Sequence, residues 1–215
     1  MRGTLPILAL TGMLATTAFG DRDFVCKIRA AGMGGDYSTL SAWETAIQSD
    51  LTSVNSRVFV VSSLGTYSTS DDGKSVTFTG GGTGTLKHIN TASNAYVVSC
   101  SGTIEAGTVN VTAGGSFDIG DTGEQVGLAV AECYNDWPAT GLSPTEINGW
   151  TVNSSHYIRI YAPAGQRHNG IPKSGANYTG FALKMTADWG NLIVWHGYTR
   201  IGGIIIDKNF LIRFA

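Results

Sequence analysis

The stretch of sequence that decides the fold is Gly34-Gly-Asp-Tyr-Ser-Thr-Leu-Ser-Ala-Trp-Glu44, which joins a flexible glycine turn to a short amphipathic helix. Leu40, Trp43 and Ile47 follow the spacing i, i+3 and i+7, so they share one helical face and are predicted to be buried. Almost everything after this helix reads as strands. A single helix ahead of many strands predicts a cap over the open end of a β-structure, in which the Trp43 side chain fills the end of the core.

The start of this helix offers two candidates for the N-cap, Ser38 and Ser41. Ser41, followed three residues later by Glu44, fits a capping box. We therefore expect the helix to begin within this segment and to keep Glu44 on its solvated face.

The composition indicates an all-β protein. Of the 215 residues 29 are glycine and only 14% are charged, against about 25% charged residues in typical globular domains. Glycine with many Thr, Ser, Asn and Val residues suits short strands joined by tight turns. The net charge of −2 gives no basic footprint, so the composition argues against a nucleic-acid partner.

The middle of the chain, residues 56–125, consists of short apolar segments bounded by Gly or Asn/Ser clusters. This pattern of short segments and turns predicts a small antiparallel β-domain, which could be a sandwich, a barrel or a meander. The strand candidates are residues 57–61, 75–79, 95–99, 108–112 and 116–119.

The last part of the chain holds a weak internal repeat. The pattern I-x-G-x-x-[VI] occurs at residues 147–152 and again at 201–206, which is 54 residues later. Two turns of roughly 25 residues each are typical of the stacked coils of a β-solenoid. A β-sandwich can produce the same pattern by chance, and the solenoid is the favoured interpretation. Further strand candidates are residues 128–132, 157–161, 181–185 and 192–195.

Several segments together resemble the opening coils of right-handed parallel β-helix (pectate-lyase-like) proteins. Besides residues 34–44, the resemblance rests on Ala131-Glu-Cys-Tyr134, Ile147-Asn-Gly-Trp150, His156-Tyr-Ile-Arg-Ile-Tyr161 and Arg167-His168. It implies an all-β fold, a short right-handed parallel β-helix (solenoid) with an N-terminal capping helix and an inserted small antiparallel β-domain. Proteins that open in this way occur among secreted bacterial proteins and phage or virus-derived structural proteins.

The chain is thereby divided into four predicted parts. Arg2 followed by the apolar run Leu5–Phe19 resembles a signal peptide, and an extended arm that packs on a neighbouring subunit is the rival interpretation. The parts are a leader-like segment or arm (1–22), a capping strand and helix (23–55), the inserted β-rich domain (56–125) and the β-helix coils (126–215).

Cysteine and histidine patterns indicate no metal and no cofactor. The three cysteines have no metal-ligand spacing, and three buried thiols in strands is a better interpretation than one disulfide with a free thiol. The histidines form no HxH or HExxH pair and are predicted to be ordinary surface or turn residues. These residues are Cys26, Cys100, Cys133, His88, His156, His168 and His196.

Catalytic residues cannot be assigned. In lyases and hydrolases with the resembled fold, acidic residues and an Arg or Lys lie on an exposed strand face. The corresponding candidates here are Arg159, Arg167, His168, Asp188 and Asp207. A glycosidase needs two nearby carboxyl groups, and no such pair recurs one coil apart. Arg159 alternates with isoleucines on both sides, so it is predicted to point outward into solvent.

Aromatic residues are dense in the last 80 residues. Exposed rings stack on sugars, whereas buried rings would fill a solenoid core. Trp137 and Trp189 lie in loop-like segments, which makes them the candidates for glycan stacking.

The sequence therefore predicts a non-enzymatic structural or adhesive surface protein, in particular a phage virion component such as a fibre, spike or capsid decoration. The alternative is a secreted carbohydrate-active enzyme, a polysaccharide lyase or hydrolase, or its N-terminal fragment. Both functions would place the protein outside the cell or on a virion surface.

The expected partners are other copies of the chain, other virion proteins and a cell-surface glycan, with no membrane span. Apolar segments at 204–206 and 210–214 would be uncovered at the end of a short solenoid, which favours self-association. A trimer is the first expectation, because related phage spikes look trimeric.

Overall fold

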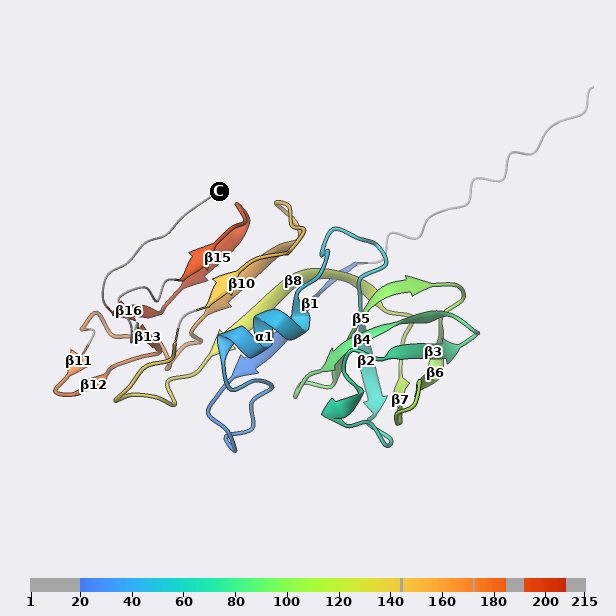
Figure 1. Cartoon of the computed structure of the whole chain (residues 1–215), viewed down its shortest axis with the longest axis horizontal. Coiled ribbons are helices and arrows are strands. Elements are labelled where there is room, and N and C mark those ends of the chain that lie inside the picture. Colours follow the sequence, from blue (N-terminus) through green and yellow to red (C-terminus); the bar gives the residue numbers. More distant parts are fainter. Residues whose placement is uncertain (1–19, 144, 172, 185–191, 208–215) are drawn as a thin grey trace, which may run out of the picture.

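The computed structural model describes residues 20–143, 145–171, 173–184 and 192–207. In these ranges the chain is all-β, as the composition predicts, with one α-helix, α1 (Leu40–Ile47), and one 3-10 turn, η1 (Thr69–Asp71). Figure 1 shows a barrel at one end of the molecule, parallel strands at the other, and α1 between them. The leader-like run Leu5–Phe19 and the apolar segment 210–214 lie outside the described residues.

Six consecutive strands form a closed antiparallel barrel. Their order is β2–β5–β4–β3–β6–β7, and β7 pairs with β2 to close it. Every pair in this ring is antiparallel. The strands are β2 (Arg57–Ser63), β3 (Ser75–Thr79), β4 (Thr83–Ile89), β5 (Asn94–Ser101), β6 (Glu105–Val111) and β7 (Ser116–Ile119).

The barrel closes around its own core because its strands alternate apolar and polar residues. In β3, Val76 and Phe78 are buried while the residues around them are exposed, so each side chain takes the face that the strand period dictates. Phe78 packs on Phe59 of β2 with ring centroids 5.1 Å apart. Leu86, Val97, Val109 and Phe117 complete this core from the other strands.

A parallel sheet of four strands continues from the barrel in the order β1–β8–β10–β15. It consists of β1 (Asp21–Ile28), β8 (Glu124–Cys133), β10 (Tyr157–Tyr161) and β15 (Thr199–Gly202). The first residues of β8 pair antiparallel with the start of β2, through Arg57 and Gln125. The long strand β8 therefore belongs to both halves and joins them.

Short two-stranded sheets complete the described part of the chain. β9 (Glu146–Ile147) pairs parallel with β14 (Ile193–Val194), and β13 (Ala182–Lys184) pairs parallel with β16 (Ile205–Asp207). β11 (Lys173–Ser174) and β12 (Asn177–Tyr178) form an antiparallel hairpin. Ile205 and Ile206, predicted to be uncovered, therefore lie in a paired strand.

The prediction of a right-handed parallel β-helix is wrong, because the largest organised unit is the closed antiparallel barrel. The I-x-G-x-x-[VI] repeat misled the prediction, since its two copies are not equivalent. Ile147 lies in β9, which pairs with β14, whereas Ile201 lies in β15, which pairs with β10. What the copies share is a left-handed glycine, Gly149 (φ 73°) and Gly203 (φ 71°). The repeat therefore marks two turns and no coil period.

Helix α1 buries the face that its spacing predicts. Leu40, Trp43 and Ile47 are fully buried, and the helix packs against β1, β4 and β8. The Trp43 ring lies on Trp150, with centroids 5.7 Å apart. Burial of so large a side chain contributes about 3 kcal/mol or more, judged from the cost of truncating buried Trp residues.

The predicted caps of α1 are wrong. The N-cap is Thr39, whose hydroxyl accepts a hydrogen bond from the Ala42 N–H at 3.0 Å. Glu44 does not close a capping box; its carboxylate accepts the N–H of Asn148 at 3.1 Å. A tertiary hydrogen bond thus takes the side chain that the local motif would have used.

The three cysteines are free and buried, as predicted. Cys26 lies in β1, Cys100 in β5 and Cys133 in β8. Burial raises the pKa of each thiol above that of an ordinary cysteine. Within the described ranges, no helix is long and apolar enough to cross a membrane.

A buried ion cluster joins the segment before α1 to the barrel. His88 of β4 is only 3% exposed, so its predicted place at the surface is wrong. Its Nδ1 lies 2.8 Å from Oδ2 of Asp72, and its Nε2 lies 3.7 Å from Oδ1 of Asp36. The first contact is a hydrogen bond, while the second is an ion pair beyond hydrogen-bond distance. The Tyr67 hydroxyl donates to Asp72 at 2.8 Å, and the Tyr37 ring covers the imidazole at 4.9 Å.

Asp36 also holds two backbone segments. Its carboxylate accepts the N–H of Lys27 at 2.6 Å and the N–H of Thr91 at 2.5 Å. These bonds connect the glycine turn to β1 and to the loop between β4 and β5. Asp36 therefore ties three parts of the chain to one buried carboxylate.

The cluster predicts a pH dependence of stability. Burial alone would lower the pKa of His88, but the carboxylates of Asp36 and Asp72 outweigh it and raise the pKa to about 9, from 6.5. The pKa of His88 is higher in the folded protein than in the unfolded chain. The stability that the charged His88 contributes is therefore complete below about pH 6.5 and is lost as the pH rises through about 9. We expect the stability difference between the wild type and His88→Gln to fall by about 3 kcal/mol between pH 6 and pH 10. Urea unfolding at both pH values measures it, and parallel pH profiles of the two proteins would contradict it.

Candidate functional site

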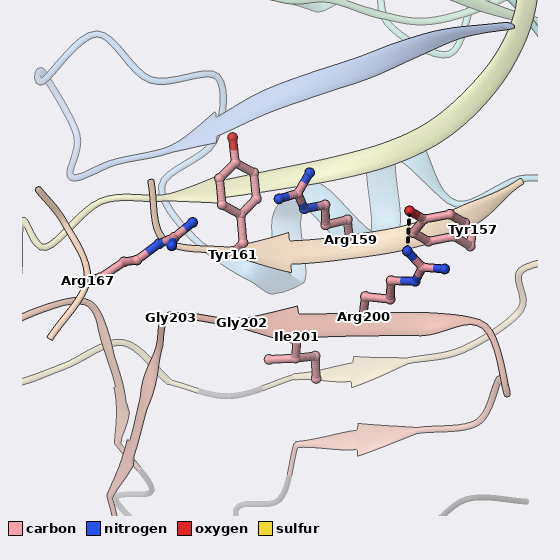
Figure 2. Close-up of a pocket in the computed structure, with 8 residues that line it drawn as sticks. All are labelled: Tyr157, Arg159, Tyr161, Arg167, Arg200, Ile201, Gly202 and Gly203. Atoms are coloured by element: carbon pink, nitrogen blue, oxygen red, sulfur yellow. Dashed lines mark hydrogen bonds between the residues drawn. The ribbon is translucent and has the colours of Figure 1, made fainter. Parts of the chain in front are cut away.

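The candidate site lies on the outer face of β10 and β15. Ile158 and Ile160 are fully buried, so the residues that alternate with them point to the other side of the sheet. These are Tyr157, Arg159 and Tyr161. Arg159 is exposed, as its alternation with isoleucine predicts. Figure 2 shows these side chains above β10, whereas Ile201 of β15 points away from them.

These side chains line an open pocket of about 390 Å³. Its wall combines three arginines and two tyrosines with a short stretch of β15 and the turn that follows it. The lining residues are Tyr157, Arg159, Tyr161, Arg167, Arg200, Ile201, Gly202 and Gly203.

Two of the arginines lie on tyrosine rings. The Arg200 guanidinium carbon is 4.1 Å from the ring centroid of Tyr157, and its Nη1 donates to the Tyr157 hydroxyl at 2.9 Å. The Arg159 guanidinium carbon is 4.3 Å from the ring centroid of Tyr161. Such cation–π contacts hold a planar cation in a fixed orientation. The rings thus serve as supports for the guanidinium groups and leave little aromatic face open.

Arg159 and Arg200 are direct neighbours across β10 and β15, with paired Cα positions. Like charges at directly opposed positions destabilise a sheet. An anionic ligand bound between these two guanidinium groups would offset their repulsion.

The third arginine, Arg167, is positioned by contacts with the backbone at Ala162 and Gly203. Its Nε donates to the carbonyl of Ala162 at 2.8 Å. The side chain passes over Gly203, where an added Cβ would lie 2.8 Å from Cγ of Arg167. Gly203 also has a left-handed φ of 71°, so glycine meets two separate requirements at this position.

None of the three arginines forms an ion pair with another described residue. Two arginines elsewhere do: Arg22 pairs with Asp121 and Glu124, at 2.7 and 2.9 Å. Arg29 pairs with Asp136 at 3.1 Å. The pocket therefore gathers three guanidinium groups that form no ion pair with a described carboxylate, although the charge of Asp23 acts on Arg159 from a longer distance.

The carboxylate beside the pocket is already engaged. Glu132 of β8 accepts the hydroxyl of Tyr161 at 2.7 Å and that of Tyr134 at 2.5 Å. Burial, and then the neighbouring Glu132 charge, raise the pKa of both tyrosines to about 12. Both hydroxyls stay protonated at neutral pH and keep donating to Glu132, which fixes the Tyr161 ring beneath Arg159.

The predicted site residues are only partly brought together. Arg159 and Arg167 meet in the pocket, but Asp207 pairs with Lys173 at 2.8 Å, outside it. His168 is exposed and accepts the N–H of Gly170. Trp137 is half-buried and packs against the main core, and its role in glycan stacking stays a prediction. Asp188 and Trp189 lie outside the described residues.

The sequence analysis missed Tyr157, Tyr161 and Arg200 as site residues. The alternation of Tyr157-Ile-Arg-Ile-Tyr161 was a usable signal for the first two, because it places both rings beside Arg159. Arg200 could not be found in this way, because its place next to Arg159 depends on the pairing of two strands whose paired residues, Arg159 and Arg200, are 41 positions apart in the sequence. Among the described residues, no group of three His, Cys, Asp or Glu side chains is arranged to hold a metal ion.

Comparisons with protein-family models, with curated proteins and with solved structures find no match for this chain. The resemblance to pectate-lyase-like proteins therefore rests on its sequence motifs alone.

Gly203 provides a test of the local geometry. We expect Gly203→Ala to lower the free energy of unfolding by about 1–3 kcal/mol, because the new Cβ meets both the left-handed backbone and Arg167. Gly202→Ala is the matched control, since a Cβ at that neighbouring position meets no other atom within 4 Å. Urea unfolding of both variants measures the effect. Equal stabilities would show that Gly203 is not required where it lies.

Proposed function

We propose that the protein is a non-enzymatic, extracellular or surface-exposed binding protein that holds an acidic saccharide on its β10–β15 face. One observation carries this proposal: three guanidinium groups without a carboxylate partner among the described residues line one open pocket. Arginine is suited to this role because its fork of N–H donors matches carboxylate and sulfate oxygens in a bidentate manner.

The form of the pocket supports a chain-like ligand with charged groups. The pocket is open to solvent and is lined by residues of the neighbouring strands β10 and β15, as a site for an extended saccharide would be. Arg159 and Arg200 already cover the faces of Tyr161 and Tyr157, which leaves charge as the main means of recognition. This favours acidic sugars, with uronate or sulfate groups, over neutral ones.

The alternative function, a polysaccharide lyase or hydrolase, has less support. A glycosidase needs two carboxyl groups at the scissile bond, and none of the pocket-lining residues carries one. Glu132, beside the pocket, is held by two tyrosine hydroxyls. The described residues of the pocket thus offer cationic groups for binding a ligand, and they include no pair of carboxyl groups for acid–base catalysis.

Two narrower predictions are separate from this proposal. Self-association, with a trimer as the first expectation, stays a prediction. Assignment to a phage fibre, spike or capsid decoration is not part of the proposal, because it depends on the β-helix resemblance and the fold is a barrel with additional strands.

Binding of defined oligosaccharides tests the proposal. We expect oligogalacturonate or a chondroitin sulfate oligosaccharide to bind the wild type, and a maltooligosaccharide of equal length to bind at least tenfold more weakly. Arg159→Gln and Arg200→Gln should each weaken acidic-ligand binding about tenfold, since a hydrogen bond to a charged group contributes about 1.5–3 kcal/mol. Isothermal titration calorimetry measures these affinities, which should also fall as salt is raised.

Arg57→Gln is the control for the loss of one positive charge. Arg57 lies in β2 of the barrel, where its Nε donates to the carbonyl of Val54 at 3.2 Å. This variant should bind the acidic oligosaccharide as the wild type does. Equal binding of neutral and acidic ligands, or an equal loss in Arg57→Gln and Arg200→Gln, would contradict the proposal.

A further inference from the structure

A second pocket lies between the end of α1 and the barrel. Its volume is about 500 Å³, within the range of pockets that bind small molecules. Most residues of its wall have polar side chains, and they come from the end of α1 and the segment after it and from strands β4 and β5. The lining residues are Gln48, Ser49, Asp50, Ser53, Asn55, Ser56, Lys87, Val98, Ser99, Cys100 and Ser101.

Lys87 of β4 is the unusual residue of this pocket. It is half-buried, and it also lines a neighbouring hollow with Thr45 and Ala46 of α1, so its stem runs beneath the helix. Burial lowers the pKa of its ammonium group, and no carboxylate offsets this effect. None of the ion pairs and hydrogen bonds formed by the described residues involves the Lys87 ammonium. By contrast, Lys74 pairs with Asp71 at 2.9 Å and Lys173 with Asp207 at 2.8 Å.

Ser99 stands in the wall of the pocket in a strained conformation. Its φ is 55°, in the left-handed region that non-glycine residues rarely adopt. The strain arises at a β-bulge: between the pairs Thr83–Ser101 and Thr85–Val98, β5 has one residue more than β4. Bulges re-aim side chains and occur often beside binding sites. Here the bulge leaves the Ser99 hydroxyl exposed, without a partner among the described residues.

Most other polar groups of the wall are already bonded. The Ser49 hydroxyl bonds to the Ile47 carbonyl and the Tyr96 hydroxyl, and the Ser56 hydroxyl bonds to the Asp50 carbonyl. The carboxylate of Asp50 accepts the N–H and the hydroxyl of Thr52.

The side-chain amide of Asn55 has no described partner. The groups left open are therefore one ammonium, one hydroxyl and one amide, on Lys87, Ser99 and Asn55. They offer one positive charge together with neutral donors and acceptors, which is the complement of a hydroxylated molecule with one anionic group.

We propose that this pocket is a second binding site, in which Lys87, Ser99 and Asn55 hold a small polyhydroxylated ligand with one anionic group, a sugar acid or a sugar phosphate. The site is separate from the arginine pocket on β10 and β15 and does not depend on its function. The Lys87 ammonium binds the anionic group, and the serine and asparagine side chains bind hydroxyl groups of the ligand.

Chemical labelling of lysines tests this site separately from the arginine pocket. The full-length protein is treated with sulfo-NHS-acetate at neutral pH, and acetylation of Lys87 and Lys74 is followed by peptide mass spectrometry. We expect glucuronate or glucose 6-phosphate to slow acetylation of Lys87 at least fivefold, glucose to leave it unchanged, and Lys74 to be unaffected throughout. Protection by only one of the two anions would assign the anionic group as carboxylate or phosphate and would still support the site.

Two variants separate binding from folding. Ser99→Gly removes the hydroxyl but suits the positive φ, so it should fold at least as stably and bind the protecting anion about tenfold more weakly. Lys87→Gln, which has no amine to label at this position, should bind the anion at least tenfold more weakly in isothermal titration calorimetry. Arg200→Gln should keep the protection of Lys87. Unchanged Lys87 acetylation at saturating glucuronate and glucose 6-phosphate, or equal protection by glucose, would overturn the proposal.

Discussion

The structure depends first on the buried ion cluster of Asp36, His88 and Asp72. A charged imidazole so far from solvent is stable only if carboxylates and hydrogen bonds replace the water that it has lost. The carboxylates come from the turn before α1 and from the segment before β3, while the histidine comes from β4. These segments must meet before the cluster is satisfied. It therefore fixes the position of the glycine turn, and with it the direction in which α1 leaves that turn.

The position of α1 in turn connects the two halves of the molecule. Trp43 reaches the core that lies beneath the parallel strands, where it packs on Trp150, while the helix also contacts β4 of the barrel. Strand β8 makes the second connection, since it pairs with β2 at its start and with β1 and β10 further on. The outer face of β10 and β15 thus belongs to a continuous paired sheet, and sites on strands place binding groups more precisely than sites on loops. The two proposed binding sites lie on different parts of the molecule. One uses arginine side chains of β10, β15 and the segment between them, and the other uses Lys87 of the barrel.

Local features of the fold could be predicted from the sequence, whereas pairing could not. The spacing of Leu40, Trp43 and Ile47 gave the helix and its buried face, and the alternation around Arg159 gave its exposure. Strand register depends on residues far apart in the chain, and so the glycine repeat suggested stacked coils where the chain forms a barrel. His88 was predicted to lie at the surface because its partners, Asp36 and Asp72, are both far from it in the sequence.

The central claim, that Arg159, Arg167 and Arg200 form one binding site for an acidic saccharide, is tested most directly by nuclear magnetic resonance of the arginine side chains. The Nε–Hε signals report on each guanidinium group separately, so one titration with oligogalacturonate examines every described arginine at once. We predict shifts confined to the three pocket arginines, with Arg22 and Arg29 unmoved because each already has a carboxylate partner. Shifts spread evenly over all arginines, or absent from the pocket, would contradict this account.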